Sequence, residues 1–149
     1  MKITYKKTLS ISLLIIGIVV ILFSTGSSVL TYNVIGIPAG NLIVWIGFIS
    51  LQLGAYALKK GFKASSSLIG KLMRYLMLFL IGVSFLWFGI AYLISGNLAF
   101  NFNSNASGYF GSPKASILYW NIIYTLVIAP IALLILYSLL RYFEHLKER

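Results

Sequence analysis

Charged side chains are absent from three long stretches of this sequence, and that pattern restricts the fold more than any other feature. No charged residue occurs between Lys7 and Lys59, between Arg74 and Lys114, or between Lys114 and Arg141. A helix needs about 20 apolar residues to cross the hydrocarbon core of a bilayer. The first stretch therefore has room for two crossings joined by a turn, and each of the others has room for one.

The composition agrees with a membrane protein. Hydrophobic residues make up 60% of the 149 residues and charged residues make up 9%, whereas a soluble domain has roughly 25% charged residues. A soluble fold of this size could not shield so much apolar surface from water. We therefore predict an all-α integral membrane protein, a single domain built as a bundle of four transmembrane helices.

Glycine, proline and clusters of polar residues mark the limits of the expected helices. These helices cover about residues 8–28, 42–58, 71–94 and 114–146. Two polar loops, 31–41 and 96–112, should lie on one side of the membrane, and the basic loop 59–70 on the other. Pro113 suits the first turn of the last helix. Pro130, near the middle of that helix, should bend it.

The distribution of basic residues predicts the orientation in the membrane. Eleven of the twelve lysines and arginines fall at the chain ends or within residues 59–74, and only Lys114 falls on the opposite side. Cytoplasmic loops carry an excess of lysine and arginine. We therefore expect both termini and the 59–70 loop in the cytoplasm, with the chain in the plasma membrane. The sequence Asn105-Ala106-Ser107, an acceptor for N-glycosylation, falls in a loop expected outside.

The net charge of +10 does not indicate nucleic acid as a partner. The basic residues flank apolar spans and form no continuous face, so an attraction to anionic lipid is the expected consequence. The N-terminal span also resembles a secretory signal peptide, with lysines, an apolar run and small residues at 24–28. We expect this segment to be retained as a helix.

Few side chains in the sequence could carry chemistry. The chain has no cysteine and one histidine, His145, and its two carboxylates, Glu144 and Glu148, lie in the C-terminal tail. Proton-coupled transporters place carboxylates or histidines inside the membrane, and a haem or metal site needs more ligands than this chain supplies. We therefore predict no catalytic residue, no metal and no cofactor. The lack of cysteine and the isoleucine-rich spans are also typical of a thermophile.

Small residues recur at helical spacing in three of the expected spans. They stand seven residues apart on the first and third helices and in a series of threes and fours on the second: Ser10, Gly17 and Ser24; Gly82 and Gly89; Gly47, Ser50, Gly54 and Ala57. This spacing suits left-handed helix crossings, and small side chains let two backbones approach closely. We interpret the stripes as packing inside the bundle, with a docking groove for another subunit as the alternative.

Three polar side chains fall within the expected spans: Gln52, Asn121 and Thr125. An unpaired amide in hydrocarbon is costly, so Gln52 should bond a neighbouring helix through Ser84, Ser12 or a backbone carbonyl. A hydrogen bond to a quinone or a lipid is the alternative for this residue. We expect the same two possibilities for the pair on the last helix, with contact to a neighbouring helix preferred.

Part of the third span resembles a known family. The residues Arg74-Tyr75-Leu76 to Gly82, followed by Phe85-Leu86-Trp87-Phe88-Gly89, resemble the opening helix of the DoxX/DoxD-type four-helix membrane proteins. Some of that group are linked to sulfur-compound oxidation and quinone reduction. The similarity covers residues 74–89, and no site residue is carried over from it.

These observations lead to a functional expectation that depends largely on exclusion. We expect a non-catalytic accessory subunit of a larger membrane complex, such as a respiratory oxidase or a membrane oxygenase, with other integral membrane subunits and lipid as partners. The alternative that the resemblance implies is a quinone-reactive oxidoreductase subunit of the DoxD kind, with quinone near Gln52 or Trp87. A small channel or transporter, which needs a continuous polar path, and a virion membrane protein are further alternatives.

Overall fold

The computed structural model describes residues 4–63, 65, 67–102 and 112–147. These residues form four long helices: α1 (Tyr5–Ser24), α2 (Ala39–Leu58), α3 (Leu68–Ser95) and α4 (Pro113–Lys147). Each of the four is long and apolar enough to cross a membrane. The prediction of a helical chain with four potential spans is therefore confirmed.

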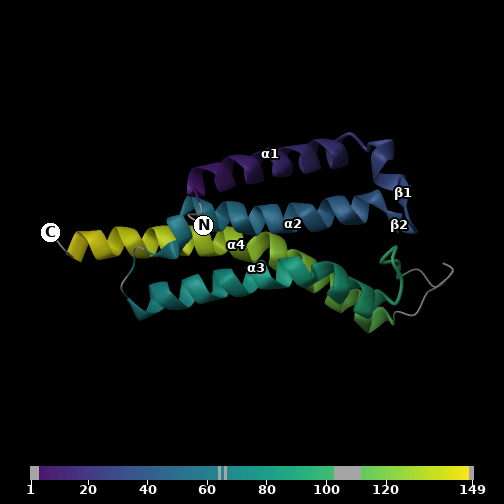
Figure 1. The fold of residues 1–149 in the computed structure, drawn as a ribbon. Helices are drawn as coiled ribbons and strands as arrows, with labels where there is room; N and C mark the ends of the chain where they lie inside the picture. Colours follow the sequence, from purple (N-terminus) through teal and green to yellow (C-terminus); the bar gives the residue numbers. More distant parts are fainter. Residues whose placement is uncertain (1–3, 64, 66, 103–111, 148–149) are drawn as a thin grey trace.

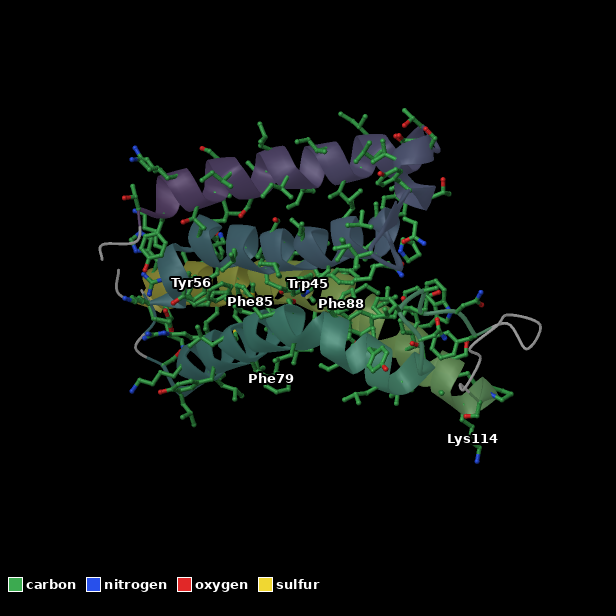
Figure 2. The ribbon with its side chains drawn as sticks, turned by 45° about the vertical axis from the view of Figure 1, so that its right-hand side comes forward. Trp45, Tyr56, Phe79, Phe85, Phe88 and Lys114 are labelled. Atoms are coloured by element: carbon green, nitrogen blue, oxygen red, sulfur yellow. The ribbon has the colours of Figure 1, made fainter. Side chains whose placement is uncertain are left out.

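The helices run up and down along the chain, and α2 lies between α1 and the α3–α4 pair (Figure 1). The start of the chain, the α2–α3 connection and the end of α4 lie at one end of the bundle. Lys114 lies at the other end (Figure 2), whereas the remaining described lysines and arginines belong to the segments at the first end. We call that first end the basic end.

The first two helices differ from their expected limits. α1 stops at Ser24, four residues before its expected end, and a 3-10 turn, η1 (Ser28–Thr31), follows after a short break. A short hairpin follows, with β1 (Asn33–Val34) paired antiparallel to β2 (Ile37–Pro38). α2 begins directly after the hairpin, so Gly40 and Asn41 lie in its first turn and do not break it. The first turn tolerates such residues because its N–H groups have no intrahelical partners to lose.

The ends of α3 follow from local capping. Ser67 precedes the helix, and its hydroxyl accepts a hydrogen bond from Gly70 N at 3.1 Å, as N-cap serines do. Gly96 ends the helix in the left-handed conformation, with φ at 72°, where glycine lacks the steric penalty of other residues. The α2–α3 connection contains a 3-10 turn, η2 (Lys60–Phe62). α4 continues through Pro130 as one helix.

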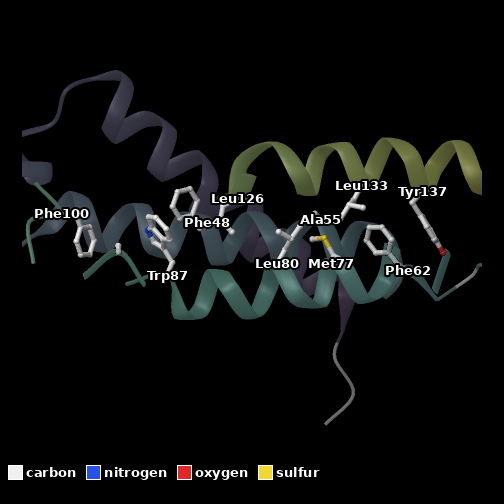
Figure 3. Packing of buried hydrophobic residues seen from close by; sticks show 11 residues of the cluster. Phe48, Ala55, Phe62, Met77, Leu80, Trp87, Phe100, Leu126, Leu133 and Tyr137 are labelled. Atoms are coloured by element: carbon white, nitrogen blue, oxygen red, sulfur yellow. The ribbon is translucent and has the colours of Figure 1, made fainter. Parts of the chain in front are cut away.

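A line of buried side chains runs along the bundle between α2, α3 and α4 (Figure 3). It comprises Phe48, Ala55, Phe62, Met77, Leu80, Trp87, Ala91, Phe100, Leu126, Leu133 and Tyr137. α1 contributes none of these, and Ser12 is the one buried residue along its described length. The core is therefore formed by three helices, with α1 packed against the outer side of α2.

Candidate functional site

A polar contact is buried in the middle of the bundle, between α2 and α4. Gln52 is 0% exposed, and its Nε2 donates a hydrogen bond to the carbonyl oxygen of Leu126 at 2.6 Å. In an uninterrupted α-helix that carbonyl accepts from the N–H four residues later. The residue at that position is Pro130, which has no N–H. The amide of α2 therefore takes the place of the backbone donor that proline removes from α4.

The packing of α2 against α3 sets the position of this amide. The indole nitrogen of Trp45 donates to the carbonyl oxygen of Ser84 at 3.0 Å, and the rings of Phe48 and Trp87 meet edge to face at 5.8 Å. Because the two helices are antiparallel, these contacts fix their register along the whole crossing. Gln52 lies one turn beyond Phe48 on the same buried face of α2, which directs it to α4.

Two buried polar atoms near this level have no hydrogen-bond partner within the described part of the chain: Gln52 Oε1 and Ser84 Oγ. Of the three partners expected for Gln52, only a backbone carbonyl receives its hydrogen bond. A buried polar group left unpaired costs about 1–3 kcal/mol. Amides and hydroxyls do not titrate near neutral pH, so this centre offers hydrogen bonds and no acid or base.

The small residues of the second helix are buried or face α1. A Cβ on Gly54 would lie 3.0 Å from the Cβ of Ser12, and one on Gly47 would lie 3.4 Å from a methyl group of Val19. Ser50 and Ala57, from the same stripe, are also buried. These glycines therefore allow α1 to approach α2 closely.

The small residues of the first and third helices face outward from the bundle. A Cβ on Gly17, Gly82 or Gly89 would meet nothing within 4 Å. Ser10 and Ser24 are exposed, and each hydroxyl bonds a carbonyl of its own helix. Small residues with the same spacing in the sequence can therefore face inward or outward. Which way they face depends on where the neighbouring helices lie.

Asn121 and Thr125 also differ from expectation. Both are exposed, and the hydroxyl of Thr125 donates to the carbonyl oxygen of Asn121 at 2.8 Å within α4. They line an open hollow of about 280 Å³ between α3 and α4, together with apolar side chains that include Phe79 and Ile122. Neither side chain hydrogen-bonds a neighbouring helix among the described residues. The glycosylation candidate Asn105 lies outside those residues.

A polar cluster at the basic end fastens the α2–α3 connection to α4. The hydroxyl of Ser65 donates to Glu144 Oε1 at 2.6 Å, and its backbone N–H donates to the hydroxyl of Tyr137 at 3.2 Å. Arg141 Nη1 donates to Glu144 Oε2 at 2.7 Å. The sequence gave no reason to link Ser65 to this carboxylate, because 79 residues separate the two.

This cluster should respond to acid. The pKa of Glu144 lies below its ordinary value of 4.5, and the hydrogen bond from Ser65 is the largest cause. Desolvation raises this pKa, whereas the hydrogen bonds from Ser67 and Arg141 lower it further. Glu144 lies beyond the charge-free stretch of α4. Since the folded pKa is lowered, the contribution of the carboxylate to stability is complete above the unfolded pKa. It is lost as pH falls through the folded pKa.

A spin label at Lys63→Cys should report the change, since the chain has no other cysteine. We expect the label to be restrained at neutral pH and to become mobile as pH falls below 4.5. In Glu144→Gln, which lacks the charge that Arg141 pairs with, the label should already be mobile at neutral pH. An equal acid response in both proteins would show that another group holds the connection.

The described residues contain no group of three or more histidines, aspartates or glutamates placed to hold a metal. Gln52 and Trp87, the expected quinone contacts, are 0% and 1% exposed, so a quinone would reach them only if the helices separated. No protein-family model, curated protein or solved structure matches this chain. The resemblance to the DoxX/DoxD helix therefore depends on residues 74–89 alone.

Proposed function

We propose that this protein is a non-catalytic accessory subunit of a larger membrane assembly and that α3 provides the surface for its neighbour. The supporting observation is the exposed face of α3. Exposed residues follow one another at alternating steps of three and four: Leu72, Tyr75, Phe79, Gly82, Leu86, Gly89 and Leu93. A seven-residue repeat of this kind is the pattern by which two helices pack in a left-handed crossing.

The shape of this face also suits a neighbouring helix. Large side chains project from it, and Phe79 points away from the bundle (Figure 2). The two glycines leave gaps between these projections, with nothing within 4 Å of a Cβ at either position. Helices in membranes associate through close packing at small residues, since lipid is as apolar as the side chains. Contact with lipid alone would require neither the glycines nor their spacing.

The inventory of polar groups supports a structural role. Gln52 Nε2 is engaged with the backbone of α4, and the carboxylate of Glu144 is engaged with Ser65 and Arg141. The two hollows between α1, α2 and α4 are lined by apolar side chains. Binding to a partner through helix surface requires none of the titratable or redox-active groups that catalysis or proton transfer needs.

Leucine at Gly82 and Gly89 should separate association from folding. We expect Gly82→Leu/Gly89→Leu to retain the thermal stability of the isolated protein, because both positions are open. Recovery of companion membrane proteins after native purification should fall about tenfold, which corresponds to about 1.4 kcal/mol. Gly17→Leu, at an open position on α1, is the matched control. The companions should become less abundant without the protein, while each retains its cofactors.

Three results would contradict the proposal. One is undiminished recovery of the companions with the double α3 variant, and another is catalysis by the isolated protein. The third is a stoichiometric quinone within its own bundle, which would favour the oxidoreductase alternative.

We also propose that the basic end faces the cytoplasm of a plasma-membrane protein, as the excess of lysine and arginine at that end favours. Ile35, in the turn between β1 and β2, is 94% exposed, and Lys63 is exposed at the basic end. A membrane-impermeant maleimide should label Ile35→Cys on intact cells and Lys63→Cys only after lysis. The reverse result would invert the topology.

A further inference from the structure

An apolar groove runs along the bundle between α1 and α4, with α2 as its floor. Two adjoining hollows of about 390 and 130 Å³ form it, and Ile16, Leu51 and Ile131 line both. On α1 the lining extends from Leu9 to Phe23. At 1.5 Å per residue this is about 21 Å, most of the thickness of a bilayer's hydrocarbon core.

The dimensions favour a hydrocarbon chain over a protein helix. A helix with a diameter of about 10 Å needs roughly 1,600 Å³ over that length, which is more than the two hollows provide. It could enter only if α1 moved away from α4, and the contact of α1 with Gly47 and Gly54 opposes such a movement. A flexible, unbranched chain fits a long and narrow apolar space without that change.

Three lysines lie near the groove where it reaches the basic end. Five of the six lining residues of α1 follow steps of three and four: Leu9, Leu13, Ile16, Val20 and Phe23. One further step of three toward the N-terminus leads to Lys6, which therefore lies on the same side of α1. On α2 the lining ends at Leu58, and Lys59 and Lys60 follow directly.

No described carboxylate is free to neutralise these lysines. Glu144 is engaged with Ser65 and Arg141, and it is the only acidic residue among those that the structure describes. A ligand at this site would therefore combine a hydrocarbon chain with a negatively charged group at the basic end. Anionic phospholipids have this combination, and clustered basic residues beside the membrane attract them.

We propose that this groove binds an acyl chain of one anionic phospholipid from the leaflet at the basic end, with its headgroup against Lys6, Lys59 and Lys60. The site is separate from the α3 face on which the proposed function depends, because α1 and α3 lie on different sides of α2 (Figure 1). Either surface can therefore be altered without changing the other.

Native mass spectrometry of the delipidated protein with added phosphatidylglycerol or phosphatidylcholine tests the proposal. We expect one tightly bound phosphatidylglycerol per protein and about tenfold weaker retention of phosphatidylcholine. Ile131→Trp, which fills the groove where the two hollows join, should abolish retention of both lipids. Ile135→Trp, at an exposed position one turn along α4 outside the groove lining, should retain wild-type binding.

A second variant tests the role of the lysines, and its result does not depend on whether Ile131→Trp folds. Lys6→Gln/Lys60→Gln should remove the preference for phosphatidylglycerol, whereas Lys114→Gln at the other end should leave it unchanged. Equal binding of the two lipids by the wild type, or an unchanged preference in the lysine variant, would overturn the proposal. So would crosslinking of Ile131→Cys to a companion protein in the native membrane, which would identify a protein as the occupant.

Discussion

Gln52→Met is expected to lower the free energy of unfolding by about 1–2 kcal/mol, the range for a hydrogen bond between membrane helices. Methionine has a similar length but no N–H, so the carbonyl of Leu126 would have neither the amide of Gln52 nor an N–H from residue 130. The loss is limited because the substitution also removes the unpaired Gln52 Oε1. Thermal unfolding in detergent measures it, with Leu53→Met on the same helix as the control.

A double-mutant cycle tests the physical explanation directly. Pro130→Ala restores a backbone N–H that can donate to the carbonyl of Leu126 within α4. Gln52→Met should therefore lower the free energy of unfolding less than half as much in the Pro130→Ala background as in the wild type. The difference between the two values is the coupling energy between residues 52 and 130. An equal cost in both backgrounds would mean that the amide does not substitute for the missing N–H.

Gly54→Leu is expected to be the more damaging change of the two. Even a Cβ at this position would lie 3.0 Å from the Cβ of Ser12, and a leucine side chain would force α1 away from α2. Overpacking typically costs about 1–3 kcal/mol, and α1 joins the bundle mainly through α2, the helix from which it would be pushed away. We expect a lower unfolding temperature and faster proteolysis of α1.

A size exchange provides the control for this prediction. Gly54→Ala should destabilise the protein moderately, and adding Ser12→Gly should recover part of the loss, since it removes the atom that the new methyl group meets. Gly17→Leu, at an open position of α1, should have little effect. Similar unfolding temperatures for Gly54→Leu and Gly17→Leu would show that the close approach of α1 and α2 contributes little.

The distribution of charge predicted the four potential spans because it depends on composition over lengths of 20 residues or more. The helix ends were harder to predict, since they depend on local contacts. Ser67 caps α3 through its own hydroxyl, and α2 begins where the β1–β2 hairpin ends. Neither contact produces a change in hydropathy that a reading of the sequence could detect.

The candidate site was only partly predictable for a different reason. Gln52 and Pro130 each stood out in the sequence as an exception within an apolar span. Their connection through the carbonyl of Leu126 depends on the register of α2 against α4, which tertiary packing sets. The same reason applies to the glycines: those of α2 face α1, whereas Gly82 and Gly89 of α3 have no neighbour.

The sequence separation of the Gln52–Leu126 hydrogen bond has a consequence for biosynthesis. The two residues are 74 positions apart, and a ribosome adds about 5–20 residues per second, so the amide waits about 4–15 s for its acceptor to be made. α1 and α2 can meet at Gly54 during that interval, because both helices are already synthesised. The first hairpin is therefore complete for several seconds before the amide on its free side meets its acceptor. That side stays uncovered until α4 packs against it.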